Sequence, residues 1–236
     1  MTTGSSEPHA DDVYAGAKVY TPFVLNQYDL LVMRLITPGV WRCPRRELVD
    51  LYSRNLGARH LDLGPGTGLF LDICPFPVAQ PRVALVDLNE NSLRVAAARI
   101  RRYQPLTFQR DVLQPLELGP ERFDSAGLNF LLHCIPGPIE RKAVVFDHIA
   151  EYLTPEGRVF GSTVLAHGVR HRWPAGPLLR AYQRWGVFQN GADSLDALCT
   201  ALTRRFSEVR VRRFGSVALF EASGPLRGRT DTPPSG

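Results

Sequence analysis

The chain has 236 residues and a formal net charge of +5 at pH 7, with 28 Lys and Arg against 23 Asp and Glu. This length allows one domain of about 170 residues plus an extra element, enough to bury a large core. No apolar run reaches the roughly 18 residues that a membrane-spanning helix needs, and the polar first residues lack the pattern of a secretory signal. We therefore expect a cytoplasmic protein with no part in a membrane.

The basic residues are 26 Arg and only 2 Lys, and they are dispersed along the chain. No basic block is interleaved with aromatic residues, so a nucleic-acid partner is not favoured despite the positive charge. The four cysteines are scattered and form no C-x-x-C pair. We expect free thiols in a reducing compartment and no metal site, whereas the oligomeric state has no signature in the sequence.

Residues 9–57 precede the first expected strand and are rich in aromatic side chains. Two helices are expected there, near 24–37 and 44–56, because Pro38 ends the first pattern and Pro44 stands where the second begins. The polar residues at the two ends of the chain are expected to be disordered tails, over 1–10 and 224–236.

Residues 58–71 combine an apolar strand pattern, a glycine-rich turn and the start of a helix. Gly64, Gly66 and Gly68 alternate in the turn, and Asp62 lies in the strand before it. Glycine permits a tight turn and the close approach of a ligand, so this segment predicts a cradle for a nucleotide-like ligand. The spacing differs from the G-x-G-x-x-G fingerprint of dinucleotide-binding proteins.

Two further acids follow expected strands. A near-continuous apolar run at 82–88 predicts a buried parallel strand that ends at Asp87. An acid in this place, about 20 residues beyond the last glycine, is suited to accept hydrogen bonds from ribose hydroxyls. Asn89 can cap a helix over residues 90–103, and residues 106–113, which contain Asp111, predict a third strand.

A fourth strand and its turn are expected over residues 122–134, with 129–134 at the carboxyl end. Open α/β sheets bind ligands at that end, beside the point where the strand order reverses. His133 is the titratable residue of this turn that can exchange a proton near neutral pH. Asp124, at the start of the strand, should be remote from the site.

The rest of the chain predicts a helix at 140–152, a turn at 153–157, a strand at 158–165, a last helix at 195–205 and a terminal hairpin around residues 214–216. Between the strand and the hairpin, residues 166–206 are rich in aromatic side chains and suited to a pocket for an acceptor. His167 and His171 have the spacing of a metal pair on a helix, but a glycine between them and a proline after them disfavour that helix.

In this order, the elements of residues 57–222 resemble a class I S-adenosylmethionine (SAM) methyltransferase. The glycine segment resembles the first motif of that family, Phe123-Asp124 resembles the start of its fourth strand, and residues 153–157 resemble the turn before its fifth. The resemblance implies an α/β fold with a seven-stranded Rossmann-like sheet, an antiparallel last strand and an N-terminal helical lid. It implies SAM as the cofactor, a lid over 11–56 and a SAM-binding domain over 57–223.

The resemblance also implies roles for individual residues. Asp111 would contact the adenine amino group, and Val112 would offer its backbone amide. His133 or His167 would take a proton if the acceptor is a hydroxyl or an amine. The implied cofactor-binding residues, two of them in the lid, are Tyr20, Tyr28, Asp62, Gly64, Pro65, Gly66, Gly68, Asp87, Leu88, Asp111, Val112 and Asn129.

The acceptor is expected to be a small, flat, largely apolar molecule, because aromatic residues gather in the lid and in residues 166–206. The whole chain resembles actinobacterial natural-product methyltransferases, some of which methylate the indole C3 carbon of tryptophan-derived alkaloids. Our first hypothesis is therefore methylation of an indole C3 carbon. The alternatives are an O- or N-methyltransferase of another small metabolite, an RNA or protein methyltransferase, and a non-catalytic protein of this fold. The retained glycines and Asp87 count against the last of these.

Overall fold

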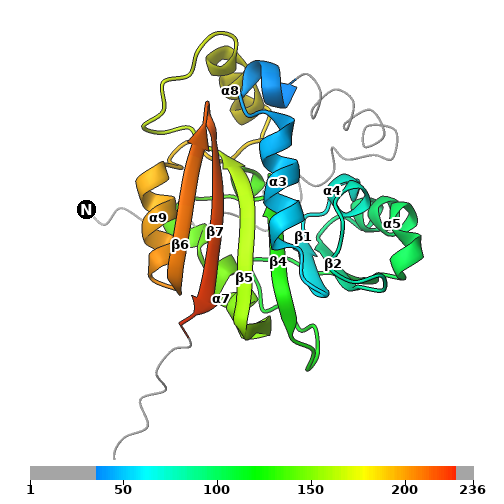
Figure 1. Cartoon of the computed structure of the whole chain (residues 1–236). Helices are drawn as coiled ribbons and strands as arrows, with labels where there is room; N and C mark the ends of the chain where they lie inside the picture. The colour runs from blue at the N-terminus through cyan, green and yellow to red at the C-terminus, as the bar shows by residue number, and fades with distance from the viewer. Residues whose placement is uncertain (1–35, 227–236) are drawn as a thin grey trace, which may run out of the picture.

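The computed structural model describes residues 36–226, and its strands form one sheet (Figure 1). The strands are β1 (Arg59–Leu63), β2 (Arg82–Asp87), β3 (Leu106–Gln109), β4 (Phe123–Asn129), β5 (Leu153–Val164), β6 (Phe206–Phe214) and β7 (Val217–Pro225). Their order across the sheet is β3-β2-β1-β4-β5-β7-β6. The described strands therefore begin in the middle of the sheet with β1, continue toward one edge, and then build the other side from β4 onward.

Neighbouring strands from β1 to β5 run parallel, and the last of the described strands, β7, is antiparallel to both of its neighbours. β7 lies between β5 and β6, and its pairing with β5 runs from Arg158↔Ser223 to Val164↔Val217. The predicted seven-stranded sheet with an antiparallel last strand is confirmed.

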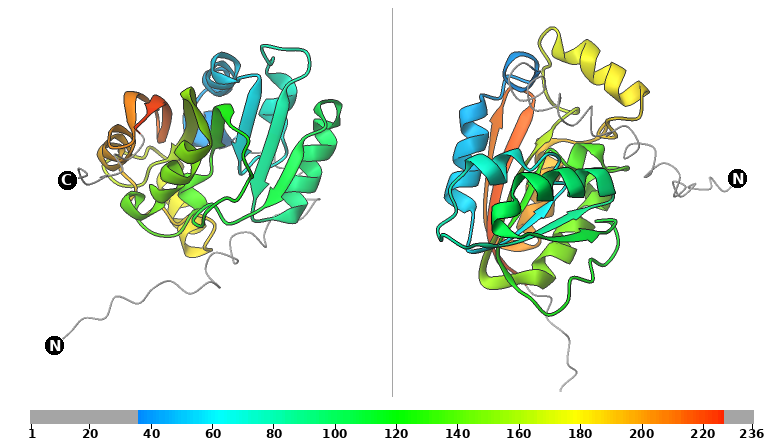
Figure 2. Two further views of the ribbon diagram at one scale, coloured as in Figure 1. Left: turned by 90° about the horizontal axis from the view of Figure 1, so that it is seen from below. Right: turned by 90° about the vertical axis from the view of Figure 1, so that its right-hand side faces the viewer.

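The described helices are α3 (Arg45–Asn55), α4 (Leu69–Ile73), α5 (Glu90–Arg99), α6 (Ile139–Lys142), α7 (Val144–Tyr152), α8 (Ala175–Arg184) and α9 (Leu195–Thr203), with 3-10 turns at Arg101–Tyr103 and Leu132–Cys134. They cover both faces of the sheet (Figure 2). Side chains of α3, α4 and α5 share one hydrophobic cluster with the sheet, and those of α6, α7 and α9 share the other. α8 lies beyond the carboxyl end of β5, at the top of Figure 1.

β1 shows how one strand serves both layers. Leu61 and Leu63 are fully buried in the cluster on the α7 side. His60 and Asp62 alternate with them and therefore point to the other face, which α3 covers. This strand thus carries two buried polar side chains into the layer between the sheet and α3.

Most predicted elements are present, with shifts at their ends. The helices expected over 44–56, 90–103 and 195–205 appear as α3, α5 and α9. α5 begins where the Asn89 side chain accepts a hydrogen bond from a backbone N–H, and Ser194 caps α9 in the same way.

Other boundaries differ from the predictions. The helix expected over 140–152 is divided at Ala143 into α6 and α7. The turn expected over 153–157 is instead the beginning of β5, where the pairing with β4 shifts register. α8 has no counterpart among the predicted elements, and β7 continues to Pro225, inside the expected tail.

α3 differs from the prediction in its role. Leu48 and Leu51 are fully buried, and they share a hydrophobic cluster with Phe160 of β5 and Leu219 of β7. α3 therefore belongs to the core of the domain rather than to a lid. Of the remaining predicted lid, the structure describes a π-helical turn at 36–40, and residues 11–35 lie outside the described part of the chain.

Candidate active site

A cavity lies at the carboxyl edge of the sheet, where the chain leaves β1, β2 and β4. The strand order reverses between β1 and β4, which is where open α/β sheets bind ligands. Ten of the predicted cofactor-binding residues line this one cavity: Asp62, Gly64, Pro65, Gly66, Gly68, Asp87, Leu88, Asp111, Val112 and Asn129. The other two, Tyr20 and Tyr28, lie outside the described residues.

The glycine loop turns between β1 and α4 with three positive φ angles, 66° at Gly64, 56° at Gly66 and 73° at Gly68. A β-carbon added at Gly66 would meet no atom within 4 Å, so this position faces open space in the cavity. A β-carbon at Gly68 would approach Ala96 of α5 at 3.1 Å. The middle glycine therefore leaves room for a ligand, whereas the last one allows α5 to pack closely.

Asp87 ends β2, and its carboxylate faces the same cavity. Its Oδ1 accepts a hydrogen bond from the backbone N–H of Asn89 at 2.8 Å. Burial raises the pKa of Asp87 to about 6, although backbone hydrogen bonds from Asn89 and Leu88 act in the opposite direction. A ligand that donates hydrogen bonds to this carboxylate would favour its charged form.

Asp111 and Val112 follow β3 and form a further part of the wall. Oδ1 of Asp111 accepts a hydrogen bond from the backbone N–H of Leu113 at 2.9 Å, so this side chain also stabilises its own turn. Leu88 lines the cavity between Asp87 and this turn. The acidic side of the cavity is thus built from the ends of three neighbouring strands.

The opposite wall follows β4 and is mostly apolar. Asn129 ends the strand and accepts a hydrogen bond from the hydroxyl of Ser162. Phe130 comes next with a φ of 57°, a left-handed conformation that is costly for a bulky residue and concentrates at functional sites. The remaining apolar wall consists of Leu131, Ile135, Pro136 and Val187.

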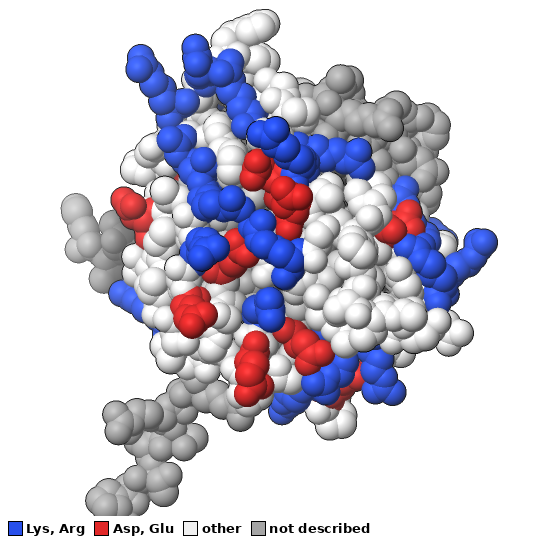
Figure 3. Space-filling model, in the orientation of Figure 1, with Lys and Arg blue, Asp and Glu red and all other residues white. Residues whose placement is uncertain are grey.

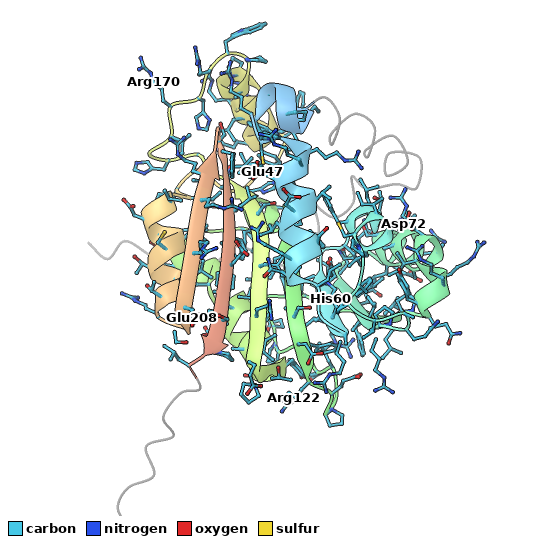
Figure 4. All side chains as sticks on the ribbon, in the orientation of Figure 1. Glu47, His60, Asp72, Arg122, Arg170 and Glu208 are labelled. Atoms are coloured by element: carbon cyan, nitrogen blue, oxygen red, sulfur yellow. The ribbon has the colours of Figure 1, made fainter. Side chains whose placement is uncertain are left out.

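Sequence reasoning missed Tyr52 of α3, which also lines the cavity. Its hydroxyl donates a hydrogen bond to Oδ2 of Asp62 at 3.1 Å. His60 Nε2 lies 3.1 Å from the same oxygen, and His60 Nδ1 lies 2.8 Å from Ser125 Oγ. Figure 4 labels His60 beside the end of α3. The helical spacing of Leu48, Leu51 and Tyr52 could have assigned Tyr52 to the buried face of its helix.

His133 differs from the predicted catalytic role. Its side chain is buried, and it is not among the residues that line the cavity. Nδ1 accepts a hydrogen bond from the backbone N–H of Val164 at 3.3 Å, and the ring packs edge-on against Phe188. Burial and, next, the charge of Lys142 lower the pKa of His133 to about 3. Such an imidazole is too weak a base to take a proton near neutral pH.

The segment 166–206 also differs from the expected acceptor pocket. His167 is exposed and outside the cavity wall, and both ring nitrogens of His171 are engaged, by Ser216 Oγ at 2.9 Å and by the Ala166 carbonyl at 3.1 Å. Of this segment, the cavity wall includes Val187 rather than an aromatic residue. The aromatic side chains either pack inward on Trp41, as Tyr182 and Phe188 do, or are exposed, as Trp173 and Trp185 are.

Charges of both signs alternate on the face that α3 and the β6–β7 hairpin form (Figure 3). Arg54 of α3 makes two hydrogen bonds to the carboxylate of Glu221, and Arg212 of β6 lies 3.8 Å from Glu47. Asp124 pairs with Arg59 at the amino ends of the strands, remote from the cavity as predicted.

Among residues 36–226, no helix has the length and apolar character needed to cross a bilayer.

Comparison with known sequences gives related proteins that carry methyltransferase names. A protein-family model described as a methyltransferase domain matches residues 40–202. Demethylluteothin O-methyltransferase of Streptomyces thioluteus is 39% identical over 94% of this chain and 97% of its own. A physcion biosynthesis cluster O-methyltransferase of Aspergillus chevalieri is 37% identical, over 89% and 95%. N-methyltransferase vrtF of Penicillium aethiopicum is 38% identical, over 78% of each chain.

Solved structures share the fold at low sequence identity. The N-methyltransferase NodS of Bradyrhizobium japonicum, in complex with S-adenosylhomocysteine (SAH), superposes with a TM-score of 0.55 at 17% identity, over 77% of this chain and 88% of its own. A complex of DhpI with SAH gives a TM-score of 0.62 at 16% identity, over 91% and 98%. These structures support the same sheet architecture.

Proposed function

Because the chain belongs to the family of SAM-dependent methyltransferases, we propose that it methylates a hydroxyl oxygen of a small, flat and largely apolar acceptor. The single observation that carries the class of acceptor is the division of the cavity into two parts, whereas the choice of oxygen rests on the names of similar proteins. One part offers glycines and carboxylates, and the other offers apolar side chains.

The polar part suits the cofactor. The open space at Gly66 leaves room beside the loop, and Asp62 would receive the ammonium group of the methionine portion. Asp87 would accept hydrogen bonds from the ribose hydroxyls, while Asp111 and Val112 would contact the adenine. When bound, SAM supplies a methyl group that its sulfonium already activates for transfer.

The apolar part suits the acceptor, since Phe130, Leu131, Ile135 and Val187 can pack against a flat ring but cannot fix a charged group. The protein's task is then to hold the acceptor oxygen in line with the methyl group and to exclude water. Among the described residues, no histidine lines the cavity. A phenolic or enolic hydroxyl fits this wall, because such a group loses its proton to solvent far more readily than an alcohol does.

Oxygen is preferred over the indole C3 carbon for a specific reason. Two of the similar proteins are named as O-methyltransferases, and the similarity to this chain extends over nearly the whole length of each. No described side chain lining the apolar part is specific for an indole N–H. The indole hypothesis therefore rests on overall resemblance alone. Methylation of an indole carbon is the alternative that the following experiment distinguishes from O-methylation.

The test is a methyl-transfer assay with SAM and matched pairs of acceptors, a phenol or enol of a given ring size against an indole of similar size. We expect transfer to the hydroxyl compounds, with an O-methyl product identified by NMR. A product methylated on the indole carbon, with the hydroxyl compounds inert, would refute the proposal.

The cofactor assignment has its own variant. Gly66→Val should abolish SAH binding in calorimetry, because the side chain would occupy the open space of the loop. Gly119→Val is a matched control, since Gly119 also has a positive φ of 84° and no atom within 4 Å of an added β-carbon, but lies outside the cavity. If both folded variants bind SAH like the wild type, the loop assignment is wrong.

A further inference from the structure

We infer that Tyr52 and His60 are positioning residues, which hold one oxygen of the Asp62 carboxylate so that the other receives the ammonium group of the cofactor. The inference rests on the proposed binding of SAM in this cavity and deepens it. It assigns a role in ligand binding to α3, a helix that lies outside the glycine loop and the strand ends.

The contacts converge on a single atom. Tyr52 Oη and His60 Nε2 are both 3.1 Å from Oδ2 of Asp62. Tyr52 belongs to α3, whereas His60 belongs to β1, the strand that also carries Asp62. Since Asp62 also lines the cavity, two donors on one oxygen direct the remaining oxygen toward a ligand.

The order of donors and acceptors agrees with this arrangement. A carboxylate oxygen only accepts hydrogen bonds, so the hydrogen between His60 Nε2 and Asp62 Oδ2 belongs to Nε2. In the neutral ring Nδ1 then accepts the hydroxyl hydrogen of Ser125, whose Oγ also accepts from the backbone N–H of Gly57 at 2.8 Å. The pKa of Tyr52 is raised well above its usual value by burial, so its hydroxyl keeps the hydrogen that it donates.

The surroundings leave these groups little freedom. The Tyr52 ring stacks on Phe70 with centroids 4.9 Å apart and meets Phe160 edge-on at the same distance. A β-carbon added at Gly127, which pairs with Asp62 across the sheet, would lie 2.8 Å from Oδ2. Glycine at this position therefore provides the space in which the donors and the carboxylate meet.

A structural role alone would predict a different result from a positioning role. Buried hydrogen bonds contribute to the free energy of unfolding wherever they occur. A positioning role predicts in addition a change in ligand affinity. Affinity should fall for a ligand that carries the portion facing Asp62 and stay the same for a ligand that lacks it. SAH and 5′-methylthioadenosine make this distinction, because the second has the adenosine portion but lacks the amino-acid portion.

The test is Tyr52→Phe, which keeps the ring and its stacking and removes only the hydroxyl. Calorimetry on the full chain should show SAH binding weakened by about five- to tenfold. Binding of 5′-methylthioadenosine should stay within about twofold of the wild type, since it makes no contact with Asp62. In an Asp62→Asn background, Tyr52→Phe should cause little further loss, because the two residues act as one unit.

Tyr152→Phe is the matched control. The hydroxyl of Tyr152 accepts a hydrogen bond from the backbone N–H of Leu118 at 3.1 Å and lies outside the cavity wall. This variant should lose stability to a similar degree but keep both affinities. Gly127→Ala, which crowds Oδ2 from the other side, should reproduce the selective loss of SAH binding.

Equal losses for both ligands in Tyr52→Phe, or no loss for SAH, would overturn the inference. If the wild type itself binds neither ligand, the proposed function is wrong instead, so the two failures are distinguishable.

Discussion

The burial of Asp87 determines the pH range in which its charged carboxylate is available to bind a ligand. Its pKa is raised from 3.8 to about 6 by burial, while two ribose hydroxyls would bind its charged form. SAH affinity should therefore rise with pH up to about 6 and then level off, with a slope of at most about tenfold per pH unit. Calorimetry between about pH 5 and pH 8 measures this. Asp87→Asn should lose the pH dependence, and a variant that keeps it would exclude Asp87 as the titrating group.

The same raised pKa predicts the direction of a stability change. The folded state binds this proton more tightly than the unfolded state, whose value is 3.8. Asp87 is therefore neutral in the folded state through part of a range in which the unfolded state is already charged. The contribution of Asp87 to the free energy of unfolding should fall as pH rises from 3.8 to about 6, and be flat above. Denaturant titrations of the wild type and Asp87→Asn at several pH values measure this difference. If the free energies of unfolding of the two proteins changed in parallel with pH, the prediction would be wrong.

Individual site residues were predictable where the backbone decides their place. Asp62, Asp87 and Asp111 each stand close to the carboxyl end of a strand, and parallel strands bring such ends to one edge of the sheet. His133 was not predictable, because the sequence does not tell which side chains of a turn point inward. Its burial against Phe188 depends on a segment more than 50 residues away in the chain.

At the scale of elements, residues 187–193 are fixed to α6 and to the turn after β4 by polar contacts. Lys142 Nζ donates to Asp193 Oδ2 at 2.7 Å and to the Gln189 carbonyl at 3.1 Å, and both charged side chains are fully buried. The backbone N–H of Gln189 donates to the His133 carbonyl at 2.7 Å. This attachment sets the position of Val187 in the cavity wall.

Lys142→Met should therefore destabilise the fold by about 3–5 kcal/mol, because it leaves the Asp193 carboxylate buried without its partner. Adding Asp193→Leu should recover most of that loss, since replacing both charges by apolar groups can be neutral. Denaturant unfolding measures both. Arg82→Met, in an ion pair with Glu121 that is largely exposed at Arg82, is the control and should cost less than about 1 kcal/mol. If Lys142→Met alone lost no more free energy of unfolding than this control, the buried ion pair would not hold residues 187–193 in place.

The elements also show where prediction from sequence stops. Pro44 marked the start of a helix expected over 44–56, and the structure has α3 within one residue of those bounds. This signal does not say what the apolar face of the helix packs against, so a lid and a core helix look alike in the sequence. α8 was missed because it begins after Pro174 in a segment with two exposed tryptophans, which obscure the helical pattern.

At the scale of the molecule, residues 41–226 contain every described strand and α helix, and residues 1–30 lie outside the described part. We expect deletion of residues 1–30 to leave the sheet folded but to destroy turnover, with SAH affinity reduced less, because a lid would position the acceptor and exclude water. Circular dichroism and a methyl-transfer assay measure the two effects. A folded and fully active deletion variant would remove Tyr20 and Tyr28 from the site.

A longer deletion separates the lid from the core. Removing residues 1–56 also removes α3, with Leu48 and Leu51, and uncovers Phe160 and Leu219 on the sheet. This variant should fail to fold, since the lost apolar burial is a large part of the net stability of a domain. If it instead folded as well as the shorter deletion, α3 would be an appendage and not part of the core.

The place of β7 governs when the chain can complete its fold during translation. Of the described strands, β7 is synthesised last, yet it lies between β5 and β6 and pairs with both. Until the ribosome has added residues 217–225, β5 presents an unpaired edge and β6 has no neighbour among the described strands. Such an edge is a template for pairing with other nascent chains. Each chain therefore passes through an aggregation-prone stage during its synthesis, which ends only when β7 has paired with β5 and β6.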